Sequence, residues 1–166
     1  MSVSEFRSSE KIPIVVVLDN VRSMHNVGSV FRTADAFRLQ GIRLCGYTPQ
    51  PPHRDIQKTA LGATETVEWS HAASATEVVD GLKAEGYSVW AVEQARGSVA
   101  LQGWSPEASD RIALVFGNEV DGVQQDVLSR CKGCIEIPQW GTKHSLNVSV
   151  AAGIVLWELV RARIEN

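Results

Sequence analysis

Three polar stretches of this sequence carry side chains whose types and spacing could do chemistry. In the first, Arg32 follows Gly28 by one helical turn, and Asn26 stands at the expected start of the same helix. A guanidinium above a glycine near a helix N-terminus, beside an amide, suits a phosphate or a developing oxyanion. The competing interpretation is a surface arginine that pairs with Asp35 or with solvent.

The second stretch follows an apolar run and holds a carboxylate between two glycines. Gly117, Glu119 and Gly122 occupy an expected strand-to-helix turn, where backbone without side chains can approach a ligand closely. Glycines and acids also populate ordinary turns, so this stretch alone does not define a site.

The third stretch, residues 135–152, passes from a β-prone run through Pro138 and a polar loop into an apolar helix. Ser145 is the expected N-cap of that helix. The apolar residues that share one helical stripe are Leu146, Val150, Gly153, Ile154 and Trp157. Asn147 and Ser149 are poor helix formers, and they either cap the helix or face a ligand.

The three stretches are flanked by segments that read alternately as strands and helices, and these elements would hold the stretches in place. Residues 12–18 form a continuous apolar, β-branched run, and residues 111–116 repeat this pattern after Arg111. Such runs are typical of strands buried on both faces of a parallel sheet. Asn26 is the expected N-cap of a helix that follows the first run. The predicted fold is therefore α/β, with a mainly parallel sheet and helices on both faces. We expect one domain over residues 1–166, which begins with a short polar segment, residues 1–11.

Composition and charge narrow the function classes. The chain is 44% apolar and 21% charged, which is ordinary for a globular protein, and no run is long and apolar enough for a signal peptide or a membrane span. We therefore expect a cytoplasmic protein that does not contact a membrane. The net charge is −3, but residues 1–60 hold eight Lys or Arg against five Asp or Glu, so a polyanion should meet this part. The single pair Cys131 and Cys134 is a weak metal signal.

Taken in order, the three stretches resemble the three motifs of the SpoU (TrmH-like) RNA ribose 2′-O-methyltransferases, a branch of the SPOUT superfamily. The first reads Asn-x-Gly-x-x-x-Arg-Thr-Ala from Asn26, and the second reads Gly-Asn-Glu-x-x-Gly from Gly117. The third joins Ile-Pro to Ser-Leu-Asn-Val-Ser-Val-Ala. The resemblance covers about residues 15–161. One departure is Gln139-Trp140 after Ile-Pro, where many members carry Met.

The resemblance implies a SPOUT fold with a C-terminal trefoil knot and S-adenosylmethionine (AdoMet) as cofactor, with no metal. The adenosine of AdoMet would be held by backbone groups of Gly117, Ile137 and Leu146, with Gln94 and Asn118 as neighbours. A homodimer is also implied, in which the second protomer helps to build the substrate site.

The resemblance further implies that methyl is transferred to a ribose 2′-hydroxyl of RNA. Arg32 would stabilise the growing alkoxide, and Glu119 would anchor Asn26 or Arg32. The residues that would orient the nucleotide are Asn26, Ser145 and Asn147. Candidates for phosphate contacts in the positive first third are Arg22, His25, Arg54 and Lys58.

The favoured substrate is a guanosine of transfer RNA, and ribosomal RNA is the rival. A catalytically silent RNA-binding module of the same fold is the alternative from another class, which the intact motif residues disfavour. A nucleotide-dependent metabolic enzyme on a doubly wound sheet is disfavoured as well, because the loop after the first strand lacks Gly-x-Gly-x-x-Gly.

Overall fold

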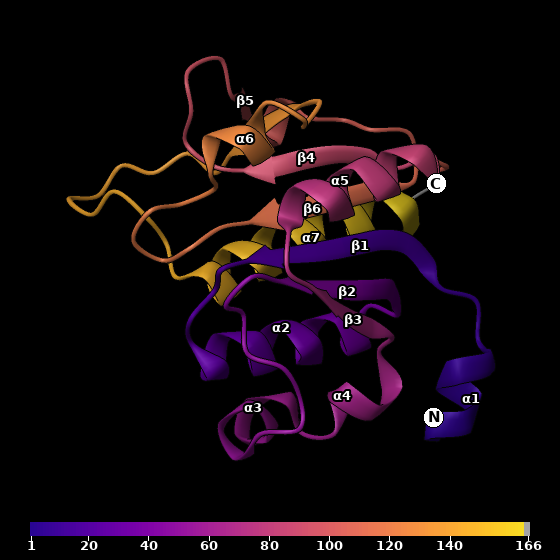
Figure 1. The fold of residues 1–166 in the computed structure, drawn as a ribbon. Coiled ribbons are helices and arrows are strands. Elements are labelled where there is room, and N and C mark those ends of the chain that lie inside the picture. The colour runs from indigo at the N-terminus through magenta and orange to yellow at the C-terminus, as the bar shows by residue number, and fades with distance from the viewer. Residues whose placement is uncertain (165–166) are drawn as a thin grey trace.

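The computed structural model describes residues 1–164, and their strands form one seven-stranded sheet (Figure 1). The strands are β1 (Ile12–Asp19), β2 (Leu39–Cys45), β3 (Trp69–Ala72), β4 (Ser88–Val92), β5 (Val99–Ala100), β6 (Ile112–Phe116) and β7 (Gly133–Glu136). Their order across the sheet is β3-β2-β1-β6-β4-β7-β5, and all six neighbouring pairs are parallel. The predicted parallel sheet is confirmed.

Helices cover both faces of the sheet, as predicted (Figure 1). They are α1 (Val3–Ser8), α2 (Met24–Ala36), α3 (Arg54–Ala60), α4 (Ala63–Thr66), α5 (Ala75–Ala84), α6 (Gln125–Leu128) and α7 (Val148–Ile164), with a 3-10 turn, η1, at Leu101–Gly103. Residues of α2 and α7 belong to one buried cluster, and residues of α5 and α6 belong to a second. No helix among residues 1–164 has both the length and the apolar character needed to cross a bilayer.

The central strand β1 supplies side chains to both clusters. Ile14, Val16 and Leu18 pack on the α2 and α7 side, whereas Val15 and Val17 pack on the α5 and α6 side. Successive side chains of a strand point to opposite faces, so a strand covered on both faces must be apolar throughout. This explains the unbroken apolar run in the sequence.

The polar segment at residues 1–11 contains a helix. Ser2 caps α1, and Phe6 in its middle is buried against the main cluster. The Arg7 guanidinium donates to the backbone oxygen of Glu65 at 2.6 Å, which ties α1 to the region of α4.

The first helix of the site starts one turn earlier than predicted. Its cap is Ser23, whose Oγ accepts a hydrogen bond from the backbone N–H of Asn26 at 3.2 Å. The prediction of Asn26 as N-cap was wrong, because a suitable hydroxyl stands three residues before it. The amide of Asn26 is thereby available for contacts outside its own helix.

The last helix starts later than predicted, and its cap is Asn147 rather than Ser145. The Oδ1 atom of Asn147 accepts hydrogen bonds from the backbone N–H groups of Ser149, at 2.9 Å, and Val150, at 3.3 Å. A side-chain oxygen that receives the N–H groups of the second and third helical residues is the usual cap geometry.

The apolar stripe of α7 faces outward. Val150, Ile154 and Trp157 are 39% to 50% exposed, and the ring of Trp157 lies 6.0 Å from that of Phe37. The face that packs on the sheet consists of Ala152, Val155, Leu156, Leu159 and Val160. α7 is therefore apolar on two sides, of which only one is covered within residues 1–164.

The end of β1 carries a buried acid. Asp19 is 4% exposed, and its Oδ2 atom has no hydrogen-bond partner among residues 1–164. Burial, assisted by the negative charge of Asp126, raises the pKa of Asp19 above its ordinary value of 3.8. In the folded chain this carboxyl therefore holds its proton to higher pH than it does in the unfolded chain.

We predict that Asp19→Asn stabilises the protein near neutral pH. Between pH 3.8 and the higher folded pKa the native state binds more protons than the unfolded state, so wild-type stability falls as pH rises through this window. The neutral amide removes that loss, by about 1–3 kcal/mol. Urea unfolding of both proteins at pH 3.5 and pH 7.5 measures the difference, and an equal difference at both pH values would contradict the prediction.

Candidate active site

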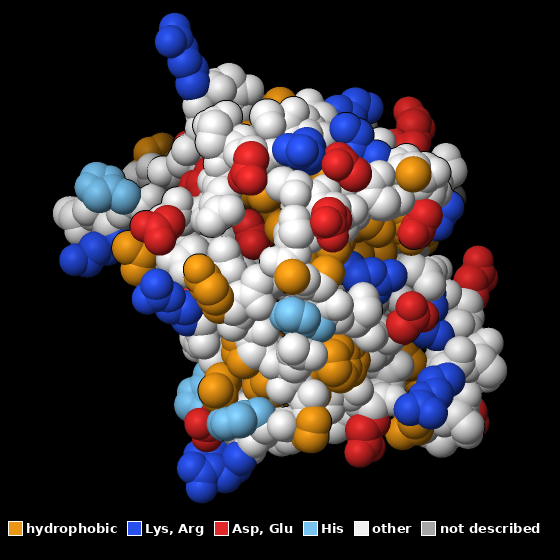
Figure 2. Space-filling model, in the orientation of Figure 1, with side chains coloured by type: hydrophobic (Ala, Val, Ile, Leu, Met, Phe, Trp, Pro, Cys, Tyr) orange, Lys and Arg blue, Asp and Glu red, His pale blue; other side chains and the backbone are white. Residues whose placement is uncertain are grey.

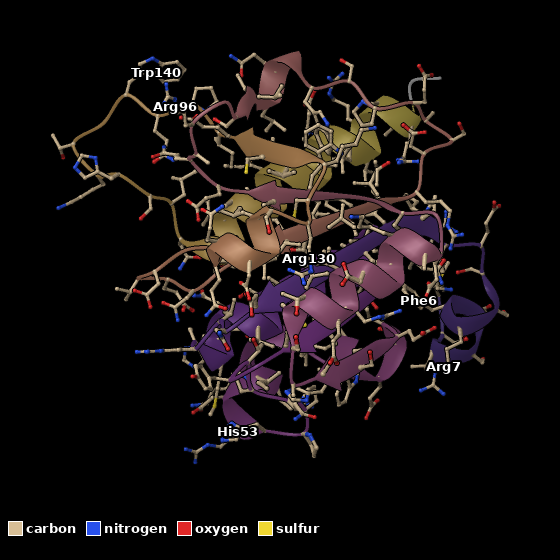
Figure 3. The ribbon with its side chains drawn as sticks, turned by 45° about the horizontal axis from the view of Figure 1, so that its top comes forward. Phe6, Arg7, His53, Arg96, Arg130 and Trp140 are labelled. Atoms are coloured by element: carbon tan, nitrogen blue, oxygen red, sulfur yellow. The ribbon has the colours of Figure 1, made fainter. Side chains whose placement is uncertain are left out.

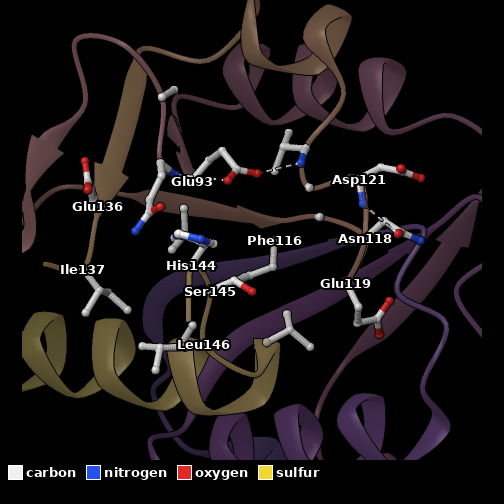
Figure 4. A pocket seen from close by; sticks show the side chains of 18 of the residues that line it. Glu93, Phe116, Asn118, Glu119, Asp121, Glu136, Ile137, His144, Ser145 and Leu146 are labelled. Carbon is white, nitrogen blue, oxygen red and sulfur yellow. Dashed lines mark hydrogen bonds between the residues drawn. The ribbon is translucent and has the colours of Figure 1, made fainter. Parts of the chain in front are cut away.

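A cavity of about 590 Å³ opens at the carboxyl ends of the central strands, within the usual size of small-molecule sites (Figure 4). Its walls are the segments after β4, β6 and β7 and the first turn of α7. In a parallel sheet these ends leave backbone groups outside the ladder, and ligands of open α/β sheets bind there. The predicted residues that line the cavity are Gln94, Gly117, Asn118, Glu119, Ile137, Ser145, Leu146 and Asn147.

Two glycines shape the loop after β6. A Cβ on Gly117 would lie 2.2 Å from the backbone carbon of Gly122, so no other residue fits there without a shift of the loop. Gly122 has a φ of 70°, which favours glycine. The backbone groups of Asn118 and Gly122 pair in both directions at 2.9 and 3.1 Å and close the turn.

Side chains hold this loop in place from two sides. The Asn118 amide donates to the backbone oxygen of Asn20 at 2.8 Å, and its Oδ1 accepts the backbone N–H groups of Val120 and Asp121. Glu93 accepts the N–H of Val123 at 2.9 Å. Glu93 was not among the predicted site residues, although an acid directly after a buried strand could have indicated a role at this edge of the sheet. Asn118 was predicted to contact the cofactor, but its side chain forms hydrogen bonds that hold the loop in place.

The cavity combines acidic side chains with unused peptide groups. Four carboxylates line it, at Glu93, Glu119, Asp121 and Glu136, and no Lys or Arg of residues 1–164 does. Within the same range, the peptide groups of Gly117 and Leu146 make no hydrogen bond. Such a lining suits a cationic ligand whose polar edge is read by backbone donors and acceptors.

Glu119 joins the cavity loop to the start of α2. Its carboxylate accepts hydrogen bonds from the backbone N–H groups of Arg22, at 3.1 and 3.2 Å, and Ser23, at 3.2 Å. Burial raises the pKa of Glu119, but hydrogen bonds from these N–H groups, from its own N–H and from the Asn26 side chain outweigh burial. The net pKa therefore lies below the ordinary 4.5. Glu119 was expected to anchor Asn26 or Arg32. Asn26 contributes to the lowered pKa of Glu119, and within residues 1–164 no hydrogen bond or ion pair joins Glu119 to the Arg32 side chain.

An amide pair connects the first and third motifs. The Asn147 side chain donates from Nδ2 to Oδ1 of Asn26 at 3.1 Å, and the Ser149 hydroxyl lies 3.4 Å from the same atom. Ser149 also donates to Oδ1 of Asn147 at 2.6 Å. Three polar side chains from α2 and α7 thus meet beside the cavity and present oriented amide and hydroxyl groups.

Arg32 lies on the exposed side of α2 and does not line the cavity. Six residues separate it from Asn26, which is about 9 Å along the helix axis and 120° around it. Its side chain forms no hydrogen bond or ion pair within residues 1–164. The predicted space over Gly28 is absent, because a Cβ there would lie 2.3 Å from the backbone oxygen of Ile56. Gly28 allows α3 to pack against α2 and does not make room for a phosphate.

The predicted RNA contacts lie outside the cavity, around the start of α2 and α3. Arg22, His25, Arg54 and Lys58 are all exposed, and Lys, Arg and His side chains gather over this region in Figure 2. Asp55 lies 3.8 Å from Arg54 and 3.4 Å from Lys58 and offsets part of their charge. On the opposite border of the site, Figure 3 shows Trp140 and Arg96 on loops that extend from the molecule.

The cysteines are free thiols. Burial raises the pKa of Cys131 to about 11 and, together with the charge of Glu93, also raises that of Cys134. No group of three or more His, Cys, Asp or Glu side chains among residues 1–164 could hold a metal ion.

We predict that Glu119→Gln destabilises the fold at neutral pH by about 1 kcal/mol, a small value because the exposed carboxylate is screened by solvent. A lowered pKa contributes stability above pH 4.5, and this contribution is lost as pH falls through the folded pKa. The loss on acidification should therefore be smaller in the variant. Urea unfolding at pH 7 and pH 3.5 tests this, and a parallel decline of both proteins would refute it.

Comparisons with known proteins identify the family of this chain. The model of the SpoU rRNA Methylase family matches residues 13–157. The 23S rRNA (guanosine-2′-O-)-methyltransferase RlmB of Vibrio cholerae is 34% identical over 154 residues, which is 93% of this chain and 61% of the relative. This chain spans 61% to 64% of the length of such curated relatives.

Solved structures are similar over nearly the whole chain. The TrmH/SpoU tRNA modifying enzyme of A. aeolicus has a TM-score of 0.86 and 26% identity, with 98% of this chain and 81% of that chain covered. The AdoMet-bound rRNA methyltransferase of Sinorhizobium meliloti has a TM-score of 0.83 and 30% identity, with 94% and 59% covered. The family model covers well over half of the sequence and includes all three motifs, so this chain belongs to the SpoU rRNA Methylase family.

Proposed function

We propose that this protein is an AdoMet-dependent RNA methyltransferase that methylates a ribose 2′-hydroxyl. The observation that carries the proposal is the arrangement of the site. An acidic cavity with free peptide groups adjoins the polar cluster of Asn26, Asn147 and Ser149. Exposed basic residues lie beyond that cluster, where a polyanion can approach.

The cavity fits AdoMet by charge and by its donors. AdoMet carries a sulfonium and an ammonium, and the cavity lining is acidic without any Lys or Arg in the described chain. The unused peptide groups of Gly117 and Leu146, together with Ile137 in the same cavity wall, would hold the adenosine. Gln94 lines the same wall, while Asn118 contributes through the shape of its loop. The sulfonium makes the methyl group of bound AdoMet electrophilic, so the reaction needs no metal.

The residues beside the cavity would hold and activate the ribose. Asn26 and Asn147 orient the nucleotide through the amide groups that they share, and Ser145 lines the cavity near them. Glu119 acts through the backbone of α2 and is a positioning residue. Arg32 stabilises the alkoxide that forms when the 2′-hydroxyl loses its proton, and it contacts the adjacent phosphate. Because an ordinary guanidinium stays protonated, water or an RNA phosphate takes the proton.

The substrate that we favour is a guanosine of transfer RNA, and ribosomal RNA is the second candidate. Similar proteins include an enzyme named for ribosomal RNA and one named for transfer RNA. Arg22, His25, Arg54 and Lys58 would contact RNA phosphates in either case. A cytoplasmic location remains a prediction.

We also infer a homodimer and a C-terminal knot. The uncovered stripe of Val150, Ile154 and Trp157 supports association through α7. Arg32 lies outside the cavity of its own chain on the helix that packs against α7, which supports a site completed by the partner. For the knot, the support is that the segments after β6 and β7 line one cavity, while α6 and α7 lie on opposite faces.

The function is tested by incubating the protein with methyl-labelled AdoMet and unmodified total RNA. We expect label in one RNA size class and a 2′-O-methylated nucleoside after nuclease digestion. Label in the small RNA fraction identifies transfer RNA, and label in the large fraction identifies ribosomal RNA. Calorimetric titration that shows no AdoMet binding would overturn the proposal and support the silent RNA-binding module.

Arg32→Lys should lower the rate of methyl transfer about 100-fold or more, because an ammonium cannot offer the paired donors of a guanidinium. AdoMet affinity, measured by calorimetry, should stay unchanged, since Arg32 does not line the cavity. The rates are measured across pH 6–9. Substantial activity of the lysine variant over this range would remove the role given to Arg32.

Ile154→Asp should convert the dimer to a monomer in sedimentation velocity and abolish methyl transfer, because a charge in a paired apolar stripe is strongly unfavourable. The control is Val3→Asp, which places the same charge on α1, away from the α7 stripe, and should remain a dimer. A monomeric wild-type protein that is fully active would contradict the inference. Mixing inactive Arg32→Ala and Asn147→Ala subunits should restore about a quarter of wild-type activity if each site uses both chains.

A further inference from the structure

An exposed aromatic ring stands on a rigid turn at the carboxyl edge of the sheet, next to the site. Tyr47 follows β2 and is 78% exposed. Among residues 1–164 its ring takes part in none of the aromatic or cation–π contacts. A large apolar ring that is left in water, without a partner in its own chain, is available to bind something else.

The turn that carries Tyr47 is fixed by several independent bonds. The backbone N–H of Tyr47 donates to Oδ1 of Asn20 at 2.8 Å. Thr48, which is buried, donates from Oγ1 to the backbone oxygens of Leu18 and Cys45 and accepts the N–H of Val21. The buried Thr48 hydroxyl and the Asn20 amide thus fix the backbone that carries the exposed Tyr47 side chain.

Backbone conformation in this turn is specialised as well. Asn20 has a φ of 54° and Gly46 a φ of 63°, both in the left-handed region. A Cβ on Gly46 would lie 2.0 Å from Oδ1 of Asn20, so the glycine is needed for the amide to reach the Tyr47 backbone. The ring is therefore presented from a preorganised base, which lowers the entropy cost of binding on it.

Two further hydrogen bonds connect the segment after β1 to the cavity loop. The backbone oxygen of Asn20 accepts the amide of Asn118 from the cavity loop at 2.8 Å. Two residues further along, Arg22 donates its backbone N–H to Glu119. Tyr47 is thus held in a fixed relation to the cavity through the residues that define the cavity loop.

The turn that carries Tyr47 adjoins a segment with basic residues, because Thr48 accepts the N–H of Val21, the residue before Arg22. Arg22 and His25 stand at the start of α2, and His53, Arg54 and Lys58 stand on or next to α3. Thr59 donates to the backbone oxygen of His25 at 2.8 Å and holds the two helices together. A fixed aromatic ring beside a group of cationic side chains is the combination that binds single-stranded nucleic acid, with bases stacked and phosphates paired.

We propose that Tyr47 is a stacking platform for an unpaired base of the RNA substrate, while Arg22, Arg54 and Lys58 contact the flanking phosphates. This rests on the proposed RNA methyltransferase function and adds that the substrate presents unpaired nucleotides to the enzyme. A base inside a duplex keeps both faces stacked on its neighbours and cannot cover the ring. The acceptor therefore lies in a loop or another single-stranded segment.

The test compares Tyr47→Ala, Tyr47→Phe and the wild-type protein for affinity to an unmodified transfer RNA pool, by filter binding without AdoMet. Tyr47→Ala should raise the Kd about tenfold, the usual effect of one lost stacking contact. Tyr47→Phe should bind like wild type, because the ring and not the hydroxyl does the stacking. Val3→Ala, which trims an exposed apolar side chain on α1, should also have no effect.

Salt and competitor experiments separate stacking from charge. Tyr47→Ala should keep the slope of log Kd against log salt, whereas Arg54→Gln should reduce it by about 0.7–0.9 for one lost phosphate contact. Single-stranded RNA should compete at least tenfold better than duplex RNA of equal length for the wild type, and this preference should shrink for Tyr47→Ala.

The outcomes distinguish this proposal from the function on which it rests. Methyl transfer and RNA affinity that are both unchanged in Tyr47→Ala would overturn the platform and leave the enzyme assignment intact. RNA affinity that depends on Tyr47, in a protein that neither binds AdoMet nor transfers methyl, would support the platform and overturn the proposed enzyme function. Equal losses in Tyr47→Phe and Tyr47→Ala, or a changed sedimentation coefficient of free Tyr47→Ala, would also refute stacking. The latter would assign this face to contact between copies of the chain.

Discussion

The carboxylate of Glu119 binds the two residues that lead into α2, although it lies in a different connection of the sheet. The N–H groups at Arg22 and Ser23 lie in the connection after β1, whereas Glu119 lies in the connection after β6. The two strands are neighbours in register, with Leu18 opposite Phe116, so their loops leave the sheet side by side and a short side chain spans them. Arg22 and Ser23 immediately precede the first turn of α2, so these hydrogen bonds tie the start of α2 to the cavity loop. The positions of Asn26 and Arg32 depend on this bond in turn.

The cavity has free peptide groups because the backbone of the loop after β6 is closely packed and bonded to itself. The loop from Gly117 to Gly122 satisfies itself through the Asn118 side chain and through its own bridge, and Glu93 holds its far end. Both glycines are needed for this closure, since a side chain at either position would meet backbone or carboxylate. A loop that needs no outside donor for its own turn leaves the peptide groups at its base unpaired. A ligand that offers complementary edges can use them without displacing any bond of the protein.

Patterns in the sequence predicted the sheet and the residues of the cavity better than the helix ends. The apolar runs at residues 12–18 and 112–116 favour strands covered on both faces, because no polar side chain interrupts them. Helix starts were less determined, since Ser23 and Asn26, or Ser145 and Asn147, both offer capping groups and the choice depends on where the chain turns. The pairing of Asn26 with Asn147 joins residues 121 positions apart, which no local pattern reports. The packing of α3 against Gly28 was hidden for the same reason.

Acidic side chains line the cavity, whereas exposed basic side chains lie outside it. This separation of charge limits where an anionic ligand can bind. Four carboxylates in the cavity wall favour a cation there and repel phosphates. In the proposed reaction, RNA would therefore place a neutral sugar edge at the cavity mouth and keep its phosphates on the basic residues outside the cavity, where Asp55 limits the attraction. The overall charge of −3 weakens attraction at long range, so salt-dependent binding alone selects RNA poorly. Selection of the proposed RNA substrate would then depend on contacts without charge, which is the role that we propose for the exposed ring of Tyr47.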